Sequence, residues 1–569
     1  MELSFLGGAT TVTGSRFLLT TARAQVLIDC GMFQGSPNEV IRNRVPLGFE
    51  PKDLDAILIT HAHLDHCGLL PVVVRDGFDG PIYLTSASAE LVEIVLLDSG
   101  RLQEEFAKRH TRWERRHPEA AASADAKTEA AYQKAAEEAE AGGQEPAAGS
   151  PAAGSHAAQE EHFPTAIESG SGSPPEAGAT ATGDSDALAA ETPETGGAAS
   201  PPMDPEATLR TQPPSIDMDL DEPLYDEEDA KLVMPLFQQA RYGKTLDVAT
   251  GIRATFSDAG HILGSAIISL EVRDEDGDEP TTIVFSGDLG RPGTPILRDP
   301  TAMTEADYVV VESTYGGREH EQGDEAIRLL AEVVNEVDRA GGVLLIPAFA
   351  IGRTQEIVWE LDRLISEGQI RELPLYLDSP MASRASDVYR RHPEFYDEET
   401  AKLLREGETP LDYPNQIITR EVAASKAIAT ADRPYMIVSS NGMLTGGRSV
   451  AHLRNLIDDP GATILFVGYQ GEGTLGRHLQ DGAKTVKVDG QIRQVHCRVR
   501  SISGFSAHAD ESELLDWLRN FGSGGEAAGP KRVFLVHGDP DAQLAIAPKV
   551  ESLGLPVHIP KWRESVTLD

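Results

Sequence analysis

The residues with the clearest chemical meaning lie close together, in a segment that reads His61-x-His63-x-Asp65-His66. This segment directly follows the apolar run Ala56-Ile57-Leu58-Ile59, which predicts a buried strand. Neutral imidazole and carboxylate groups suit zinc, with iron and manganese as alternatives. A strand ending at residue 60 would direct His61 and His63 to one side, whereas Asp65 and His66 lie one turn further on. The spacing therefore predicts ligands for two neighbouring metal ions.

Other parts of the chain offer further ligands in similar settings. Asp288 follows the β-rich run at residues 282–285, and His537 follows another at residues 532–536. Asp29 ends a shorter run at residues 25–28, and His261 lies among glycines that allow close approach of the backbone. Because these runs end in acidic residues or histidine, we expect their ends to meet at one edge of a sheet.

Counting the candidate ligands supports a two-metal site. They divide into two sets of three with one shared carboxylate: His61, His63 and His261; Asp65, His66 and His537; and Asp288 as the bridge. Zinc with an open coordination position lowers the pKa of bound water to roughly 7, which supplies a nucleophile at neutral pH. Asp29 is left over, and we expect it to orient a ligand. The alternative for Asp29 is a helix or turn cap.

Taken together, these motifs resemble the metallo-β-lactamase superfamily and, within it, the β-CASP nucleases. The branch is indicated by Val311-Glu312-Ser313-Thr314-Tyr315-Gly316, by Gly504-Phe505-Ser506-Ala507-His508-Ala509-Asp510 and by Val536-His537-Gly538. In this branch, RNA-cutting members carry histidine at the last motif and DNA-repair members usually carry valine, so His537 favours RNA. One departure is Asp539, where many relatives have glutamate. The resemblance covers most of residues 1–110 and 225–565.

The resemblance implies a fold: a metallo-β-lactamase αββα sandwich with an inserted β-CASP α/β domain. The first part of the sandwich would span residues 1–317, the inserted domain residues 318–503, and the C-terminal part of the sandwich residues 504–569. Apolar runs at residues 342–347, 375–378, 435–439 and 463–468, alternating with helical patterns such as residues 354–367, predict a parallel sheet in the inserted domain.

The resemblance also implies roles for individual residues. His508 would donate a proton to the leaving oxygen while Glu312 keeps it protonated, and Asp65 would act beside them. A buried structural pair is the alternative for His508 and Glu312. Contacts to RNA phosphate would come from Arg353, Ser379 and Ser506; a surface salt bridge is the alternative for Arg353. The implied cofactors are two Zn²⁺ ions.

Composition sets limits on the chain. It has 569 residues, three cysteines without a Cys-x-x-Cys pair, and no apolar stretch long enough to span a bilayer. We therefore expect a cytoplasmic protein with no membrane contact. The net charge of −41 has the wrong sign for a nucleic-acid binder, so metals and a few arginines must make the cleft locally positive.

Much of the acidity lies in one segment. Residues 115–222 are rich in Ala, Gly, Glu, Ser, Thr and Pro, and we predict a disordered acidic insert there, apart from a fraying helix at residues 119–140. The insert interrupts no motif, so residues 118–222 should be dispensable for catalysis. Before it we expect a helix over residues 88–109, and after it a helix from Tyr225 through Ala240.

The leading hypothesis is a zinc-dependent ribonuclease that hydrolyses phosphodiester bonds of single-stranded RNA, in RNA processing or decay. Endonuclease and 5′-to-3′ exonuclease action both stay open, and the resemblance allows a homodimer. Three alternatives are weighed against this hypothesis. They are a DNA nuclease of the same branch, another hydrolase of the metallo-β-lactamase fold, and a catalytically silent RNA-binding scaffold.

Overall fold

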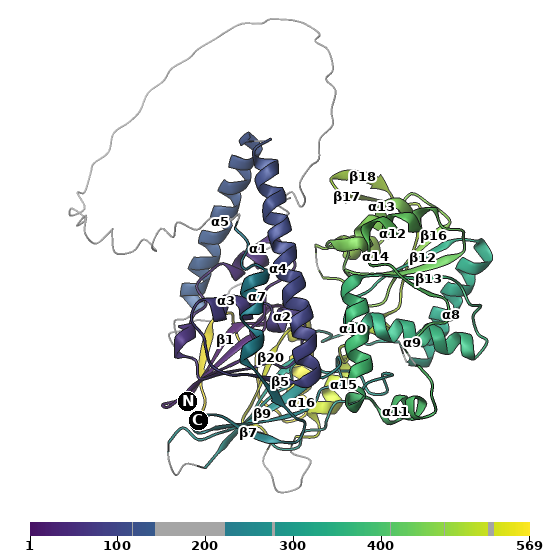
Figure 1. The fold of residues 1–569 in the computed structure, drawn as a ribbon. Helices are drawn as coiled ribbons and strands as arrows, with labels where there is room; N and C mark the ends of the chain where they lie inside the picture. Colours follow the sequence, from purple (N-terminus) through teal and green to yellow (C-terminus); the bar gives the residue numbers. More distant parts are fainter. Residues whose placement is uncertain are drawn as a thin grey trace, which may run out of the picture.

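The computed structural model describes residues 1–116, 118–142, 222–275, 279–321, 323–409, 411–471, 473–521 and 529–569. Figure 1 shows a sandwich of two sheets with helices on its outer faces and a second α/β unit beside it. The predicted αββα sandwich with an inserted α/β domain is therefore confirmed.

Within the described residues, each sheet of the sandwich has seven strands. The first runs in the order β22 (Glu564–Thr567), β1 (Glu2–Gly7), β2 (Arg16–Thr20), β3 (Gln25–Ile28), β4 (Ala56–Leu58), β5 (Ile82–Thr85) and β6 (Phe237–Ala240). The second runs β21 (Val557–His558), β20 (Arg532–Val536), β11 (Tyr308–Glu312), β10 (Thr281–Phe285), β9 (Ala266–Val272), β8 (Ile252–Asp258) and β7 (Thr245–Ala249). Strands from the C-terminal part of the chain, β22 in the first sheet and β20 and β21 in the second, thus complete both sheets.

Alternation along the strands builds the layers. In β3, Val26 and Ile28 point into the core between the sheets, whereas Leu27 packs on the opposite side, as the two-residue period of a strand requires. The outer side of the first sheet is covered by α2 (Leu64–Cys67), α3 (Leu70–Arg75), α4 (Ser86–Glu114) and α7 (Glu227–Lys231). The outer side of the second is covered by α15 (Glu511–Leu518) and α16 (Pro540–Ser552).

The second α/β unit has one main sheet in which every pairing is parallel, as predicted. Its described strands follow the order β14 (Gln416–Ile418), β13 (Leu375–Asp378), β15 (Tyr435–Ser439), β12 (Val343–Pro347), β16 (Ala462–Phe466) and β19 (Arg498–Ser501). Its helices are α8 (Gly323–Ala340), α9 (Arg353–Ser366), α10 (Pro380–Arg391), α11 (Glu398–Arg405), α12 (Val422–Ala427), α13 (Gly447–Leu456) and α14 (Leu475–Gln480). A hairpin of β17 (Thr485–Val488) and β18 (Gln491–Gln494) completes it.

The two units contact each other along α10. Its Arg391 and His392 pair with Glu90 of α4, at 2.8 Å from His392 Nε2 to Glu90 Oε1. The Tyr389 hydroxyl accepts a hydrogen bond from the backbone N–H of Leu263 at 3.2 Å. The second unit is therefore fixed directly beside the loop that carries His261.

One sequence prediction is wrong where the chain returns to the sandwich after residue 222. Instead of one helix through Ala240, the chain forms the short helix α7, a 3₁₀ turn at Met234–Leu236, and strand β6. Pro235 lacks the N–H that a continuing helix needs, and β6 gains a parallel partner in β5.

Within the segment predicted to be disordered, residues 115–222, the expected helix at 119–140 is present as α5 (Pro118–Gly142). This helix is packed rather than fraying: Tyr132, Ala135 and Ala139 are buried against Phe33 and Trp562. The rest of the predicted insert, residues 143–221, lies outside the described residues.

No helix in the described parts of the chain is long and apolar enough to cross a membrane. Cys30, Cys67 and Cys497 are buried free thiols.

Candidate metal centre

The candidate ligands lie where strands end. His61 and His63 follow β4, Asp288 follows β10, and His537 follows β20. The chain turns sharply at His537, whose φ of +46° lies in the left-handed region that non-glycine residues rarely adopt. Such backbone strain is common where a side chain is aimed into a site.

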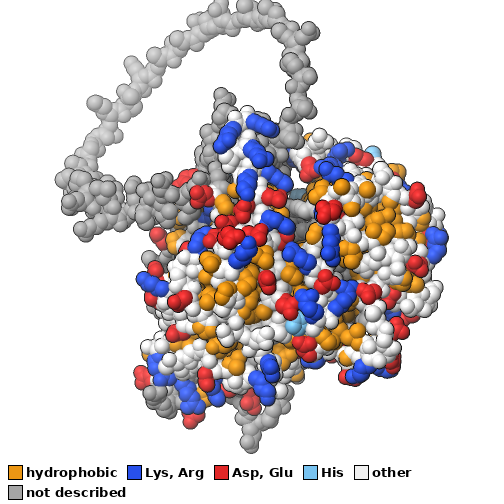
Figure 2. All heavy atoms as spheres, in the orientation of Figure 1, with side chains coloured by type: hydrophobic (Ala, Val, Ile, Leu, Met, Phe, Trp, Pro, Cys, Tyr) orange, Lys and Arg blue, Asp and Glu red, His pale blue; other side chains and the backbone are white. Residues whose placement is uncertain are grey.

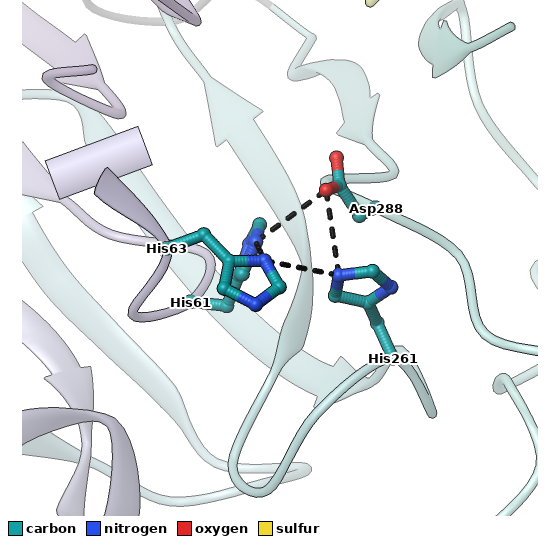
Figure 3. Close-up of side chains that lie close together, drawn as sticks. All are labelled: His61, His63, His261 and Asp288. Atoms are coloured by element: carbon teal, nitrogen blue, oxygen red, sulfur yellow. Dashed lines mark hydrogen bonds and ion pairs between the residues drawn. The ribbon is translucent and has the colours of Figure 1, made fainter. Parts of the chain in front are cut away.

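The first set of predicted ligands forms one cluster around Asp288 (Figure 3). Asp288 Oδ2 lies 3.4 Å from His61 Nε2 and 3.5 Å from His261 Nε2. His63 Nδ1 lies 3.0 Å from His61 Nε2 and 3.2 Å from His261 Nε2. One potential ligand atom from each of the four residues lies within 4.8 Å of the others, close enough to surround one ion.

The second set lies on the other side of the same carboxylate. Asp288 Oδ1 is 3.2 Å from His66 Nε2 and 3.7 Å from His537 Nδ1. His537 Nε2 is 3.5 Å from Asp65 Oδ2, and Asp65, His66 and His537 form a second group of potential ligands. The two oxygens of Asp288 thus face different sets, which is the geometry that a bridging carboxylate needs.

Several polar atoms at the centre of this cluster are buried without a hydrogen-bond partner: His63 Nε2, His66 Nε2, His537 Nε2 and Asp288 Oδ1. Buried polar atoms are normally satisfied, and each exception needs an explanation. Metal ions between these atoms would satisfy all of them. The residues therefore fit a metal site.

Protonation in part of the cluster also favours metal binding. Burial lowers the pKa of His63 to about 4 and holds the pKa of His61 and His261 well below 6.5. These three imidazoles are therefore neutral at physiological pH, which is the form that binds a metal.

Asp29, predicted to orient a ligand, contacts His66. Its carboxylate lies 2.7 Å from His66 Nδ1 and accepts hydrogen bonds from the Thr60 N–H and hydroxyl at 2.8 Å. A proton on Nδ1 leaves His66 Nε2 free to face Asp288. The alternative for Asp29, a helix or turn cap, does not describe these contacts, because the main partner is a site histidine.

Glu312 and His508 form the predicted pair. Glu312 ends β11, and its two carboxylate oxygens lie 3.0 and 3.1 Å from His508 Nδ1. Burial opposes protonation of His508, but the charges of Glu312 and Asp288 outweigh it and raise the pKa of His508 to about 9. The Leu289 N–H and the Thr314 hydroxyl also bind Glu312, at 2.6 Å each, so the carboxylate is held in place.

The residues predicted to contact RNA phosphate occupy different settings. Arg353 is buried at the start of α9, in a close ion pair with Glu356. Ser379 caps α10 by accepting the Ala382 N–H at 3.2 Å. Ser506 accepts the His508 N–H at 3.3 Å and therefore lies nearest to the metal cluster of the three.

The second unit also reaches the site, through residues that sequence reasoning did not single out. The Phe349 ring lies 6.4 Å from the His63 ring. The Tyr469 hydroxyl donates to Asp539 Oδ2 at 2.6 Å, across the junction of the two units. Asp539 is the position that departs from the family pattern, and this tyrosine is its partner here. No local motif marks either aromatic residue.

Comparison with known proteins gives three family matches. The metallo-beta-lactamase superfamily matches residues 10–100, the Beta-Casp domain residues 354–479, and the Zn-dependent metallo-hydrolase RNA specificity domain residues 493–560. The first range contains the His61–His66 segment, and the last contains His508 and His537. His261, Asp288 and Glu312 lie between the matched ranges, and the structure brings them to the site.

Relatives match over almost the whole chain. Ribonuclease TTHA0252 of Thermus thermophilus is 30% identical over 567 residues, with 100% of both chains covered. Transcription termination factor FttA of Methanocaldococcus jannaschii is 27% identical, with 97% of this chain and 69% of the relative covered. FttA of Pyrococcus horikoshii is 28% identical, with 100% of this chain and 71% of the relative covered.

Proposed function

Because the chain belongs to the β-CASP branch of the metallo-β-lactamase superfamily, we propose that it is a zinc-dependent ribonuclease that hydrolyses phosphodiester bonds of single-stranded RNA. The RNA specificity match and the ribonuclease relative support RNA as the substrate, in RNA processing or termination. The observation that carries the proposal is Asp288, whose two oxygens face two separate sets of ligands.

Two zinc ions fit this arrangement. His61, His63 and His261 would hold one ion, Asp65, His66 and His537 the other, and Asp288 would bridge them. When bound, zinc supplies Lewis acidity and a water that ionises near neutral pH. The unpartnered buried atoms of these residues support the assignment, since a metal would satisfy them.

The chain itself handles the proton. A departing ribose oxygen needs a proton, and His508 carries one at physiological pH because Glu312 stabilises the imidazolium. Glu312 also accepts from Thr314, whose hydroxyl lies 3.1 Å from His537 Nδ1. One carboxylate therefore orients both the proton donor and a metal ligand.

Contacts to RNA lie further from the metals. We assign phosphate contacts to Ser506, Ser379 and Arg353; for Arg353 this requires RNA phosphate to compete with Glu356 for the guanidinium. Sheet membership supports domain limits of 1–317, 318–503 and 504–569, because β19 and β20 belong to different units. A homodimer and a cytoplasmic location stay predictions.

Purified protein loaded with zinc should cleave unstructured RNA, and His63→Ala should abolish cleavage while the circular dichroism spectrum stays unchanged. His478→Ala, at an exposed histidine of α14, is the matched control and should keep full activity. Cleavage that survives His63→Ala would disprove the proposal. End-labelled RNA separates the two modes of action: laddering from one end means exonuclease, and discrete internal products mean endonuclease. DNA and small-ester substrates test the alternative hydrolases.

A further inference from the structure

The outer half of α4 is basic although the chain carries a net charge of −41. Residues 108–116 contain a single carboxylate, Glu114, and five cations: Lys108, Arg109, Arg112, Arg115 and Arg116. All five cationic residues are exposed. Figure 2 shows Lys and Arg side chains gathered along the hairpin that α4 and α5 form as they project from the sandwich. Because the chain as a whole is acidic, this local reversal of sign distinguishes the hairpin.

The cations face a defined direction. At 3.6 residues per turn, Arg101, Lys108 and Arg112 share one face of α4, and Glu90 lies on the same face. Arg115 and Arg116 lie in the turn directly after the helix. Glu90 is the residue that binds α10 of the second unit. These cations form a basic stripe along α4. The stripe lies on the side of α4 that contacts the second unit, but further out along the helix.

Only the inner part of the stripe is neutralised. Lys108 pairs with Glu104 at 2.7 Å, and Arg109 lies 3.4 Å from Glu105. Toward the tip, no described carboxylate lies within ion-pair distance of Arg112, Arg115 or Arg116. Among the residues whose side chains the structure describes, the tip thus presents exposed cations to the solvent.

An aromatic ring accompanies these cations. The Phe106 side chain is 56% exposed, and the Arg109 guanidinium lies 6.0 Å from its ring centroid. An exposed ring next to cations is the combination on which bases of single-stranded nucleic acid stack. A solvated charged face needs no such ring.

The hairpin is anchored relative to the metal centre. At the base of α4, the Thr85 and Ser88 hydroxyls donate to the Gly264 carbonyl, in the loop that carries His261. From Ser88 to Arg112 the helix extends about 36 Å. The return helix α5 packs against the sandwich through Tyr132, so the basic tip is held at a fixed distance from the site.

We propose that the outer half of α4 is a second contact surface for single-stranded RNA, which holds the strand beyond the part that occupies the metal site. The proposal rests on RNA as the substrate. Arg112, Arg115 and Arg116 neutralise phosphates, and Phe106 stacks on a base. The surface adds affinity for long RNA and has no part in the chemistry.

The test compares two triple charge reversals in a His63→Ala background, which binds RNA without cutting it. Arg112→Glu, Arg115→Glu and Arg116→Glu alter the tip; Lys402→Glu, Arg405→Glu and Lys426→Glu make the same charge change on exposed residues of α11 and α12. Fluorescence anisotropy reports affinity for a long unstructured RNA over a range of salt concentrations. The tip variant should lose about a hundredfold in affinity at low salt, and its log–log salt slope should become shallower by about two.

The control triple should change both quantities much less. Equal effects of the two triples would mean that only net charge matters and would overturn the proposal, as would no effect of the tip variant. Phe106→Ala should lose about tenfold in affinity, whereas Phe106→Trp should not; Leu544→Ala, at another exposed apolar residue, is its control.

A separate cleavage assay distinguishes a failure of this second RNA surface from a failure of the proposed ribonuclease function. With His63 intact, the tip variant should cleave a short oligonucleotide, too short to reach the tip, at the parental rate. If neither protein cleaves that oligonucleotide, the proposed ribonuclease function fails. If both cleave it and long-RNA affinity is unchanged by the tip variant, only the second surface fails.

Discussion

The sandwich and the second unit each contain a buried carboxylate at or just after the end of a central strand. Asp288 follows β10, and Asp378 is the last residue of β13. Both carboxylates contact histidine, yet their surroundings differ. Asp378 is fully buried, and both of its oxygens are bonded. Its partners are the Thr419 hydroxyl, the Ser425 hydroxyl at 2.5 Å, Arg448 Nη1 at 2.6 Å and His452 Nε2 at 2.6 Å. Asp288 is 2% exposed, and its neighbouring imidazole nitrogens stand at 3.2 to 3.9 Å.

Asp378 belongs to a hydrogen-bond network in which both of its oxygens are bonded, whereas the atoms around Asp288 leave places for a ligand. Burial opposes ionisation of Asp378, but the hydrogen bond from His452 and three further side-chain bonds outweigh it and lower its pKa to about 2. Around Asp288, buried nitrogens of three histidines and one carboxylate oxygen lack partners. Both clusters pair a buried carboxylate with histidine, and the unsatisfied atoms around Asp288 distinguish them.

The largest expected effect is at Asp288. Asp288→Asn should lower RNA cleavage by at least about a thousandfold, because the bridge between the two ligand sets loses its charge. Bound zinc, measured by atomic emission, should fall as well, with little change in the free energy of unfolding of the metal-free protein. Cleavage within tenfold of the parent would contradict the assignment.

The same substitution at Asp378 should act on stability instead. Asp378→Asn leaves the buried His452 and the partly exposed Arg448 with a neutral partner, which should cost about 3 kcal/mol of unfolding free energy. Urea titration measures this cost, and zinc content should stay at the parental level. If Asp378→Asn lost zinc without losing stability, Asp378 would be part of a metal site, which would contradict the structural role assigned to it.

A third change tests the proton donor next to the metal cluster. The pKa of His508 is raised to about 9, so activity that needs the imidazolium should fall as the pH rises through that value. In Glu312→Gln the stabilising charge is gone, the pKa of His508 drops, and the alkaline limb of the pH–rate profile should move to lower pH. Near neutral pH the rate should fall about a hundredfold. An alkaline limb that does not move would exclude His508 as the acid.

The smallest effect is expected at Asp29, which touches the metal cluster only through His66. Asp29→Asn should weaken zinc affinity by about tenfold to a hundredfold, and excess zinc should restore cleavage. Competition with a chromogenic chelator measures the affinity. Activity that stays low at saturating zinc would show that Asp29 does more than orient His66.

Sequence reasoning located the metal cluster but not the Asp378 network, for a physical reason. The ligand segment is local, and its residues follow one strand, so spacing alone predicts its geometry. Thr419, Ser425 and His452 come from separate elements, and only the parallel pairing of β13 with β14 and β15 brings their segments near Asp378. No pattern along the chain records that proximity.

The two helices predicted around the insert had different outcomes. Pro235 lacks a backbone N–H and is a sequence signal against a helix through Ala240. The helix predicted at 119–140 is confirmed, but its packing was not predicted: Tyr132, Ala135 and Ala139 recur at helical spacing and form the buried face of α5. A periodicity count in that segment would have detected this face.

The central claim is that Asp288 stands between two metal sites, and zinc positions in a crystal of the zinc-loaded protein test it most directly. Anomalous diffraction should show two peaks about 3.5–4 Å apart, on opposite sides of Asp288. One should lie among His61, His63 and His261 and the other among Asp65, His66 and His537, each about 2.0–2.2 Å from its ligand atoms. A single peak, or peaks away from Asp288, would contradict the account.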